Sequence, residues 1–340
     1  MGYFHSVAAK TPTRVWANNP SLADARAAIA DGAIACTTNP TYAAKELVAE
    51  PAIATRILDE AIEQASDDEE AAALVQGAFC ARLMEAFREI YASDPERSGF
   101  VSIQGSPLHE DNADAIVTST MRSASLGKNC IAKIPVTIPG LAAIRAVAAA
   151  GIPIIATEVM SVSQALAAFG AWEEGARSLR KRPMLFVTHI TGVLEERLLA
   201  LSAAGISAAE IRAASIAAAR RQYDILRGYG FCGRMLGGGA RSVEHFTGMV
   251  GLDMDVTINW RGTADALLAA DPPVVPLSPA DERTIEKARA LLPEFDAAWR
   301  EDGLAPEAFS EFGAVVLFRD RFIEGWRRLL AAVGERRSGS

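Results

Sequence analysis

A lysine lies within an apolar stretch of this chain. Lys133 belongs to the segment "NCIAKIPVTIPG", residues 129–140, and has aliphatic residues on both sides. Burial disfavours an ammonium, so it lowers the pKa of a lysine below its usual value of about 10.4 and favours the neutral amine. A neutral amine is a nucleophile that condenses with a carbonyl to form a Schiff base. The alternative is a lysine that leaves its strand outward and extends the amine into solvent.

A second polar group follows an earlier apolar run. Thr37, Thr38 and Asn39 end that run in "ACTTNPTYAAKEL", residues 35–47, and Pro40 is expected to begin a helix. In α/β barrels the C-terminal ends of the strands carry the catalytic side chains. An asparagine placed there offers both a donor and an acceptor to a hydroxylated ligand. The alternative is a structural helix start with proline at the first helical position.

Taken together, these segments resemble the transaldolase family. The resemblance rests on "TTNP" (37–40), "KIPVT" (133–137) with "GLAAI" (140–144), "TEVMSVSQAL" (157–166) and "GARSVEH" (239–245). It implies a class I aldolase mechanism without metal or cofactor. In that mechanism Lys133 attacks the ketone of a donor sugar, and a carbon–carbon bond breaks to release an aldehyde. The three-carbon dihydroxyacetone unit left on the lysine then adds to an acceptor aldehyde.

The chain departs from the family pattern at the acid and base positions. Asn18 replaces an aspartate that serves as acid and base, and an amide cannot accept a proton at neutral pH. Gln104 replaces a glutamate that acts through a water molecule, a change shared with the fructose-6-phosphate aldolase branch. The threonine of the fifth strand is kept as Thr157. The chain has therefore lost two expected carboxyl groups.

Glu158 directly follows Thr157, where the family has an apolar residue. One hypothesis is that Glu158 takes over proton transfer, directly or through water. Alternation along a strand places Thr157 and Glu158 on opposite faces. This favours the other interpretation, in which Glu158 points out of the barrel and pairs with an arginine of a surrounding helix.

The residues that match the family's phosphate site are also altered. Thr188 takes the place of a serine, Val193 that of an arginine and Gly239 that of a second serine, whereas Arg241 is kept. Losing one of two arginines should weaken selection for a phosphorylated substrate, because arginine–phosphate contacts are strong charge-assisted bonds. Arg241 and the N–H groups of Gly237–Gly239, in a turn that enters a helix, are expected to hold one anion. Thr37, Thr38 and Asn39 complete the expected substrate-binding set.

The elements that must position these residues alternate along the chain. Eight apolar runs are predicted to be strands: Arg14–Ala17, Ala33–Thr37, Phe100–Gln104, Cys130–Val136, Pro153–Thr157, Met184–Thr188, Arg234–Gly237 and Asp255–Ile258. Near-continuous apolar runs are typical of parallel strands covered on both faces. Helical patterns lie between them, and one opens with a capping box of Ser207 and Glu210. The fold class predicted is α/β, a (β/α)8 TIM barrel.

A barrel takes about 250 residues, so roughly 90 of the chain are left over. We expect a single domain, 1–340, with the barrel over 13–270. An acidic helical segment, Glu50–Ser93, is predicted as an insertion before the third strand. A helical extension over 278–335 is predicted to pack on the barrel. Its amphipathic stretch "LFRDRFIEGWRRLLAAV" (317–333) is expected to cover either the barrel base or a partner.

Charge and composition narrow the classes of partner. The net charge is −8, and no basic stripe with interleaved aromatic residues occurs, so neither nucleic acid nor an anionic membrane is an expected partner. Three of the four cysteines lie in apolar surroundings, which indicates reduced thiols in a cytoplasmic protein. No metal-ligand spacing is seen. The expected partners are a ketose and an aldose, and a homodimer or larger homo-oligomer is possible.

Three functions remain open at this stage. The first is a transaldolase-like transferase, although Asn18 and Val193 argue against an ordinary enzyme of the pentose phosphate pathway. The second is a class I aldolase or lyase that acts on another hydroxylated carbonyl compound without an acceptor, which Gln104 favours slightly. The third is a non-catalytic barrel that binds a sugar or an anion. Lys133 argues against the third, because a buried amine is costly and contributes little to stability.

Overall fold

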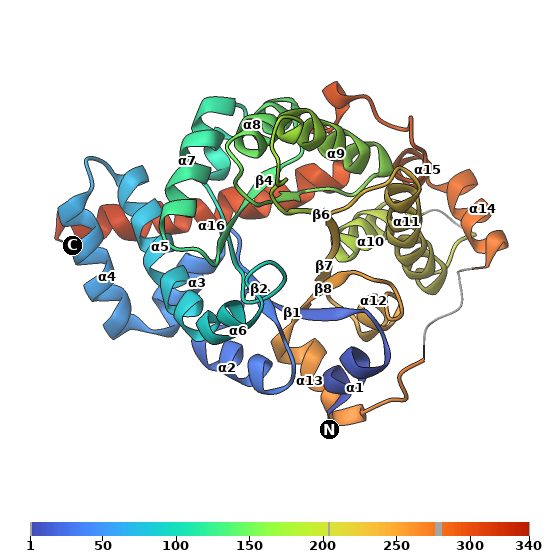
Figure 1. The fold of residues 1–340 in the computed structure, drawn as a ribbon, viewed down its shortest axis with the longest axis horizontal. Coiled ribbons are helices and arrows are strands. Elements are labelled where there is room, and N and C mark those ends of the chain that lie inside the picture. The colour runs from blue at the N-terminus through green and yellow to red at the C-terminus, as the bar shows by residue number, and fades with distance from the viewer. Residues whose placement is uncertain (1, 203–204, 276–280, 340) are drawn as a thin grey trace.

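Eight short parallel strands close into a barrel in the order in which they occur in the chain, as seen in the computed structural model (Figure 1). The structure describes residues 2–202, 205–275 and 281–339. The strands are β1 (Arg14–Asn18), β2 (Ala35–Thr37), β3 (Val101–Gln104), β4 (Cys130–Pro135), β5 (Ile154–Thr157), β6 (Leu185–His189), β7 (Arg234–Ala240) and β8 (Asp255–Asn259). This confirms the predicted (β/α)8 barrel, with strand ends that differ by up to three residues.

Helices surround the barrel and continue beyond it. They are α1 (Tyr3–Lys10), α2 (Leu22–Ala30), α3 (Tyr42–Ala49), α4 (Pro51–Gln64), α5 (Asp68–Ala86), α6 (Arg88–Ser93), α7 (Ala113–Ser125), α8 (Ile138–Ala149), α9 (Val162–Ala176), α10 (Thr191–Ala200), α11 (Ala208–Gly228), α12 (Val243–Thr247), α13 (Asp265–Ala270), α14 (Glu282–Leu291), α15 (Pro293–Trp299) and α16 (Gly313–Ser338). The capping box of Ser207 and Glu210 is present at the start of α11, as predicted. None of the described helices is long and apolar enough to cross a membrane.

The barrel interior is apolar at its base and polar one layer higher. Seven residues, one from each of seven strands or the residue just before it, fill the base: Trp16, Ala35, Phe100, Ile131, Ile155, Phe186 and Leu236. Successive side chains of a strand alternate between faces, so the residues two positions further on also point inward. These are Asn18, Thr37, Ser102, Lys133, Thr157, Thr188 and Gly238. The lysine is therefore an inward residue of the upper layer, and an outward orientation is excluded.

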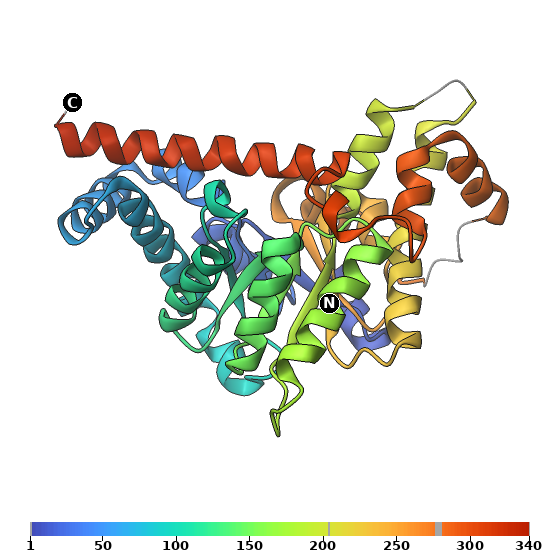
Figure 2. The ribbon, with the colours of Figure 1, turned by 90° about the horizontal axis from the view of Figure 1, so that it is seen from above.

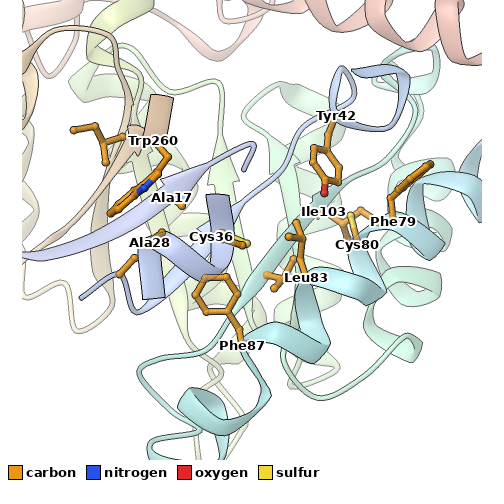
Figure 3. Close-up of a cluster of buried hydrophobic side chains, with 14 of the residues drawn as sticks. Ala17, Ala28, Cys36, Tyr42, Phe79, Cys80, Leu83, Phe87, Ile103 and Trp260 are labelled. Carbon is orange, nitrogen blue, oxygen red and sulfur yellow. The ribbon is translucent and has the colours of Figure 1, made fainter. Parts of the chain in front are cut away.

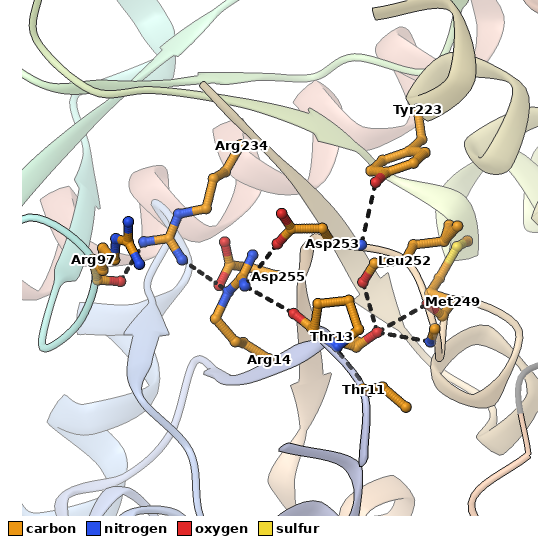
Figure 4. A network of polar contacts seen from close by, with 12 residues as sticks. Thr11, Thr13, Arg14, Arg97, Tyr223, Arg234, Met249, Leu252, Asp253 and Asp255 are labelled. Carbon is orange, nitrogen blue, oxygen red and sulfur yellow. Dashed lines mark hydrogen bonds and ion pairs between the residues drawn. The ribbon is translucent and has the colours of Figure 1, made fainter. Parts of the chain in front are cut away.

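A buried ion cluster lies at the N-terminal end of the barrel (Figure 4). Asp255 is fully buried and accepts hydrogen bonds from Arg14 Nε (2.9 Å), Trp16 Nε1 (3.1 Å) and Arg234 Nη1 (3.2 Å). Burial raises the pKa of Asp255, although the two arginines oppose that effect. The first residues of β1, β7 and β8 are joined in this way. In TIM barrels, residues at this end contribute to stability and not to catalysis.

Part of the segment predicted as an insertion belongs to the barrel itself. Phe79, Cys80 and Leu83 of α5 pack with Cys36 of β2 and Ile103 of β3 in one apolar cluster (Figure 3). Helix α5 is thus the crossover helix that connects β2 to β3, as every pair of parallel strands requires. The predicted helical segment before the third strand is present as α4, α5 and α6, and its helix α5 packs on the barrel. The additional elements are α3, α4 and α6.

The last helix, α16, lies across the C-terminal ends of the strands (Figure 2). It contacts α3, α4, α5 and α10, and also a 3-10 turn (Pro107–His109) that follows β3. Trp326 of α16 is buried and donates through Nε1 to Glu69 at 3.1 Å. Gly325 allows close approach, because a Cβ there would lie 2.8 Å from Cα of Thr41. The expectation that this helix covers the barrel base is therefore wrong, since it covers the opposite end.

The described helices of the C-terminal segment contact helices of the barrel. Phe295 of α15 and Ala314 and Val315 of α16 share an apolar cluster with Val193 and Leu194 of α10. The proposed boundary between 270 and 278 includes residues 276–278, which lie outside the described residues. The division at that point stays a prediction.

Candidate active site

Polar residues from the strands surround a cavity of about 920 Å³ at the C-terminal end of the barrel. Most of the residues predicted as site residues line it: Asn18, Thr37, Asn39, Lys133, Thr157, Thr188, Gly239 and Arg241. Six of them come from six different strands, and five of these six occupy upper inward positions. Helix α16 closes one side of the cavity with Phe318, Arg321 and Phe322. Helix α16 therefore forms one wall of the cavity at the barrel mouth.

Lys133 is held at the inner end of this cavity. Its side chain is 9% exposed, and its Nζ donates a hydrogen bond to the carbonyl oxygen of Thr38 at 3.1 Å. Burial lowers the pKa of Lys133 to about 8, and the charge of Glu158 opposes that effect. A substantial fraction of the amine is therefore neutral near pH 8. The carbonyl of Thr38 leaves the nitrogen lone pair of that neutral amine free for a carbonyl carbon.

Asn18 is fixed by two side chains on neighbouring strands. Thr37 Oγ1 donates to Asn18 Oδ1 at 3.0 Å, and Asn18 Nδ2 donates to Asn259 Oδ1 at 2.8 Å. Asn259, at the end of β8 and directly opposite Asn18, also lines the cavity. The sequence analysis missed Asn259, although its place after the apolar run of the eighth strand was a usable signal. This network orients hydroxyl groups but contains no acid or base.

The residues of the "TTNP" segment have divided roles. Thr38 Oγ1 donates to the carbonyl of Ser102 at 2.6 Å, so its hydroxyl holds β2 to β3 and Thr38 is not among the lining residues. Asn39 Oδ1 accepts from both the N–H and the hydroxyl of Thr41, at 3.0 and 2.7 Å. Helix α3 begins at Tyr42, so the expectation that Pro40 opens a helix is wrong. Thr37 and Asn39 remain at the cavity.

Glu158 points into the protein and not out of the barrel. The side chain is fully buried, and Glu158 Oε1 accepts a hydrogen bond from Gln104 Nε2 at 2.9 Å. Strand β5 ends at Thr157, and Glu158 has a left-handed backbone with φ of 60°. The carbonyl of Glu158 accepts from Gln164 Nε2 at 3.0 Å, which fixes this turn. Alternation fails because the strand has already ended, and the outward orientation favoured by the sequence is wrong.

A second carboxyl group, Glu110, shares the same amide. Gln104 Nε2 also donates to Glu110 Oε1, at 3.2 Å. Burial raises the pKa of Glu158 to about 7, and burial followed by repulsion from Glu158 raises the pKa of Glu110 well above its usual value. The two carboxyl groups therefore hold a proton between them near neutral pH. Glu110 lies in the polar loop "SPLHEDN" (106–112), where nothing in the sequence distinguishes it from a surface residue.

A further cavity of about 410 Å³ meets the same side chains from the side of α5 and α7. Gln104, Glu110 and Lys133 line it, together with Glu69 and Trp326. It is large enough and polar enough to admit water molecules. Glu110 thus borders a polar cavity separate from the larger one, whereas Glu158 is not among the lining residues of either cavity.

Two threonine hydroxyls at the larger cavity lack a protein partner among the described residues. They are Oγ1 of Thr157 and Oγ1 of Thr188, on β5 and β6. Buried hydroxyls are normally hydrogen-bonded, so these two are available to a bound molecule. The neighbouring His189 is different: it is buried, burial lowers its pKa to about 3, and its Nδ1 lies 3.1 Å from Thr191 Oγ1. His189 is therefore a neutral residue of the core.

The expected anion site is only partly formed by the glycine-rich turn. The N–H of Gly239 donates to Thr257 Oγ1 at 3.1 Å, and α12 begins with a Ser242 cap on His245. These groups are occupied, so an anion held by the backbone of Gly237–Gly239 is not supported at Gly239. Arg241 lines the cavity, and its N–H donates to His245 Nδ1 at 3.2 Å. The expectation that the guanidinium of Arg241 binds an anion stays a prediction.

These features define a (β/α)8 barrel with a buried lysine and a carboxyl pair at the catalytic end. The family model described as Transaldolase/Fructose-6-phosphate aldolase matches residues 15–303, and the chain belongs to this family. A search of curated proteins finds no match. Family membership makes the chain an enzyme of the aldolase or transaldolase type and suggests small sugar phosphates as substrates. This agrees with the resemblance seen in the sequence.

Proposed function

We propose that this protein is a transaldolase-like transferase in which Lys133 forms a Schiff base with a ketose. The supporting observation is the buried amine of Lys133, whose pKa is lowered to about 8, at the inner end of a cavity lined by hydroxyl and amide groups. The amine adds to the ketone carbon, and the resulting carbinolamine loses water to give a protonated imine. The imine accepts the electron pair of the adjacent carbon–carbon bond when that bond breaks.

Proton transfer in this proposal falls to Glu158. Bond cleavage requires a base that removes the proton of the hydroxyl next to the breaking bond, and Asn18 cannot serve because it is an amide. Glu158, with a pKa raised to about 7, is ionised in part of the molecules at neutral pH and accepts that proton directly or through water. Gln104 orients Glu158, and Thr157, Thr37 and Asn18 orient substrate hydroxyls. The aldehyde leaves, and a three-carbon enamine remains on Lys133.

The second half of the reaction runs these steps in reverse. The enamine carbon attacks the carbonyl carbon of an acceptor aldehyde, and the proton held by Glu158 passes to the new hydroxyl. Water then hydrolyses the imine and releases the new ketose. Asn39 and Arg241, at the wider part of the cavity, are placed to bind the parts of donor and acceptor that do not react.

A lyase that uses the same lysine is the second candidate. Water protonates the enamine in that case, and a free ketone is released without an acceptor. The polar cavity of about 410 Å³ beside Gln104 and Lys133 favours this outcome, since it offers water a route to the lysine. Product analysis separates the two candidates, because transfer depends on an acceptor aldehyde whereas lysis does not. A sugar-binding barrel without chemistry is the least supported reading.

Reductive trapping tests the proposal. The protein is incubated with dihydroxyacetone or fructose 6-phosphate and then reduced with borohydride. We expect a mass adduct on Lys133 that is lost in Lys133→Met. Lys45→Met is the matched control, because Lys45 lines the same cavity but lies exposed on α3. An adduct on Lys45 only, or none with a broad panel of ketoses and ketones, would overturn the Schiff-base proposal.

A further inference from the structure

Two arginines from distant parts of the chain meet at one carboxylate beside the cavity. Glu196 of α10 contacts the guanidinium of Arg241, which follows β7, and also that of Arg321 on α16. Arg321 Nη1 donates to Glu196 Oε2 at 2.9 Å, and Arg241 Nη1 contacts the same oxygen. Both arginines line the cavity, whereas Glu196 is not among the lining residues. The carboxylate thus pairs with both guanidinium groups.

The position that matches the family's second arginine cannot bind an anion here. Val193 is fully buried and packs with Ala314 and Val315 of α16. The aliphatic residue therefore belongs to the contact by which α16 docks on α10. The same contact carries Arg321 to the cavity, two turns further along α16. Loss of one arginine from α10 and gain of another from α16 are linked through this packing.

The surrounding groups favour a negative ligand. Of the described residues that line the cavity, the basic ones are Lys45, Lys133, Arg241, Arg261, Arg321 and Arg328, and the acidic ones are Asp24 and Glu324. This local excess of positive charge contrasts with the net charge of −8 for the whole chain. Thr188 Oγ1, buried and without a protein partner among the described residues, faces the same cavity. A hydroxyl donor that lines the same cavity as two guanidinium groups is a suitable setting for a phosphoryl group.

The N-terminal end of helix α10 lies close to Gly239 and Arg241. A Cβ on Gly192 would lie 2.2 Å from the carbonyl oxygen of Gly239 and 3.2 Å from Cγ and Cδ of Arg241. Only glycine allows the first turn of α10 to pack this closely against the arginine. The N-terminus of a helix favours anions, through its dipole and its free N–H groups.

We propose that Arg321 of the C-terminal helix supplies the second arginine of an anion site with Arg241 and Thr188, and that this site binds the terminal phosphoryl group of the substrate. The proposal rests on the proposed function only in taking this cavity as the substrate site. Glu196 occupies the guanidinium groups when no anion is bound. A phosphoryl group then competes with Glu196 for the faces of Arg241 and Arg321 that line the cavity.

Calorimetric titration with inorganic phosphate and with glycerol 3-phosphate tests the site without any catalysis. In Arg321→Met we expect the affinity for both to fall roughly 10- to 100-fold, as for other hydrogen bonds between charged groups. Arg321→Lys should retain part of the affinity. Arg327→Met is the matched control, since Arg327 is exposed on the same helix and does not line the cavity. Equal phosphate affinity in Arg321→Met and the parent protein would overturn the proposal.

Glu196→Gln shows whether Arg321 binds the anion or only anchors α16 through its ion pair with Glu196. If Arg321 binds the anion, removing the competing carboxylate should raise the affinity for phosphate. If Arg321 only anchors α16, Glu196→Gln should lower that affinity as Arg321→Met does. A lower affinity in Glu196→Gln would therefore count against the proposal. Circular dichroism spectra and thermal unfolding of each variant show whether α16 stays docked.

Kinetics and trapping separate this proposal from the proposed function. With a phosphorylated ketose, Arg321→Met should raise KM, and with its unphosphorylated counterpart kcat/KM should stay within about twofold. Borohydride trapping of dihydroxyacetone on Lys133 should be the same in both proteins. If Lys133 gives no adduct while Arg321 still governs phosphate binding, the Schiff-base function fails and the anion site stands. If Lys133 gives the adduct and Arg321→Met leaves phosphate binding unchanged, only the anion-site proposal fails.

Discussion

Gln104 and Glu158 are joined by a buried hydrogen bond of 2.9 Å between Nε2 and Oε1. Gln104 donates through the same nitrogen to Glu110, so one amide holds two buried carboxyl groups. The family's glutamate has been replaced by glutamine in β3, and two other carboxyl groups now surround that glutamine. In the proposed mechanism the acid and base function falls to Glu158, beside this glutamine.

Glu158→Gln tests this displacement of the base. We expect kcat to fall by about 10²- to 10⁴-fold, because a general base is lost. Trapping of dihydroxyacetone on Lys133 should persist, since it does not require bond cleavage. The charge of Glu158 raises the pKa of Lys133, so its removal should move adduct formation to lower pH. A variant with unchanged kcat, or with an unshifted trapping profile, would contradict the assignment.

Asn18→Asp should partly rescue that loss. The new carboxylate can still accept the hydrogen bond from Thr37 Oγ1, and the Asn259 amide can turn to donate to it. It returns a base to the position that the family uses. In the Glu158→Gln background we expect kcat to recover by at least about tenfold. Asn259→Asp, on the opposite strand of the same pair, is the control and should rescue less.

The free energy of unfolding should depend on pH in two ranges, one set by Glu158 and the other by Lys133. Glu158 has its pKa raised from 4.5 to about 7, so the native state binds more protons than the unfolded state between these values, and stability should fall as pH rises through that range. Lys133 has its pKa lowered from 10.5 to about 8, so stability should rise with pH from about 8 to 10.5. Each slope is at most about 1.4 kcal/mol per pH unit.

Variants identify the source of each slope. The urea midpoint of Glu158→Gln should depend less on pH below pH 7 than that of the parent protein, although Glu110 keeps part of the dependence. The urea midpoint of Lys133→Met should depend less on pH above pH 8 than that of the parent protein. A parent protein whose stability increases from pH 5 to 7, with Glu158→Gln following the same curve, would show that this carboxyl group is not held in its protonated form.

Asp255→Asn should destabilise the barrel without changing the site. Removing the charge leaves Arg14 and Arg234 without their buried partner, and breaking a buried ion pair in this way costs about 3–5 kcal/mol. Chemical denaturation gives the free energy of unfolding, and KM should be unchanged in the folded protein. Asp253→Asn is the control: its side chain is 53% exposed, it also pairs with Arg14, and its loss should cost at most about 1 kcal/mol.

The sequence predicted those parts of the site that lie within regular strands. Lys133 and Thr157 follow the period of two that sets the apolar residues Ile131 and Ile155 beneath them. Glu158 broke the same rule, because a left-handed backbone at a residue other than glycine leaves no mark in the sequence. Its buried position depends on where β5 stops.

Two other residues were beyond sequence reasoning for a different reason. Glu110 looks like any acid of a polar loop, and Arg321 is one of many arginines on an amphipathic helix. What distinguishes them is tertiary: Glu110 faces Gln104, and Arg321 shares Glu196 with Arg241, from 80 residues earlier in the chain. Contacts between distant segments, set by how α16 docks, cannot be read from local patterns.

The position of α16 also has a consequence for how the protein is made. All eight strands precede this helix in the chain. During translation the strands and Lys133 therefore leave the ribosome before α16 is available to close one side of the cavity. Until residues 313–338 emerge and dock, the reactive amine lacks its cover and Glu196 lacks one of its two arginines. The pocket therefore takes its final form only after the eight strands of the barrel have been made.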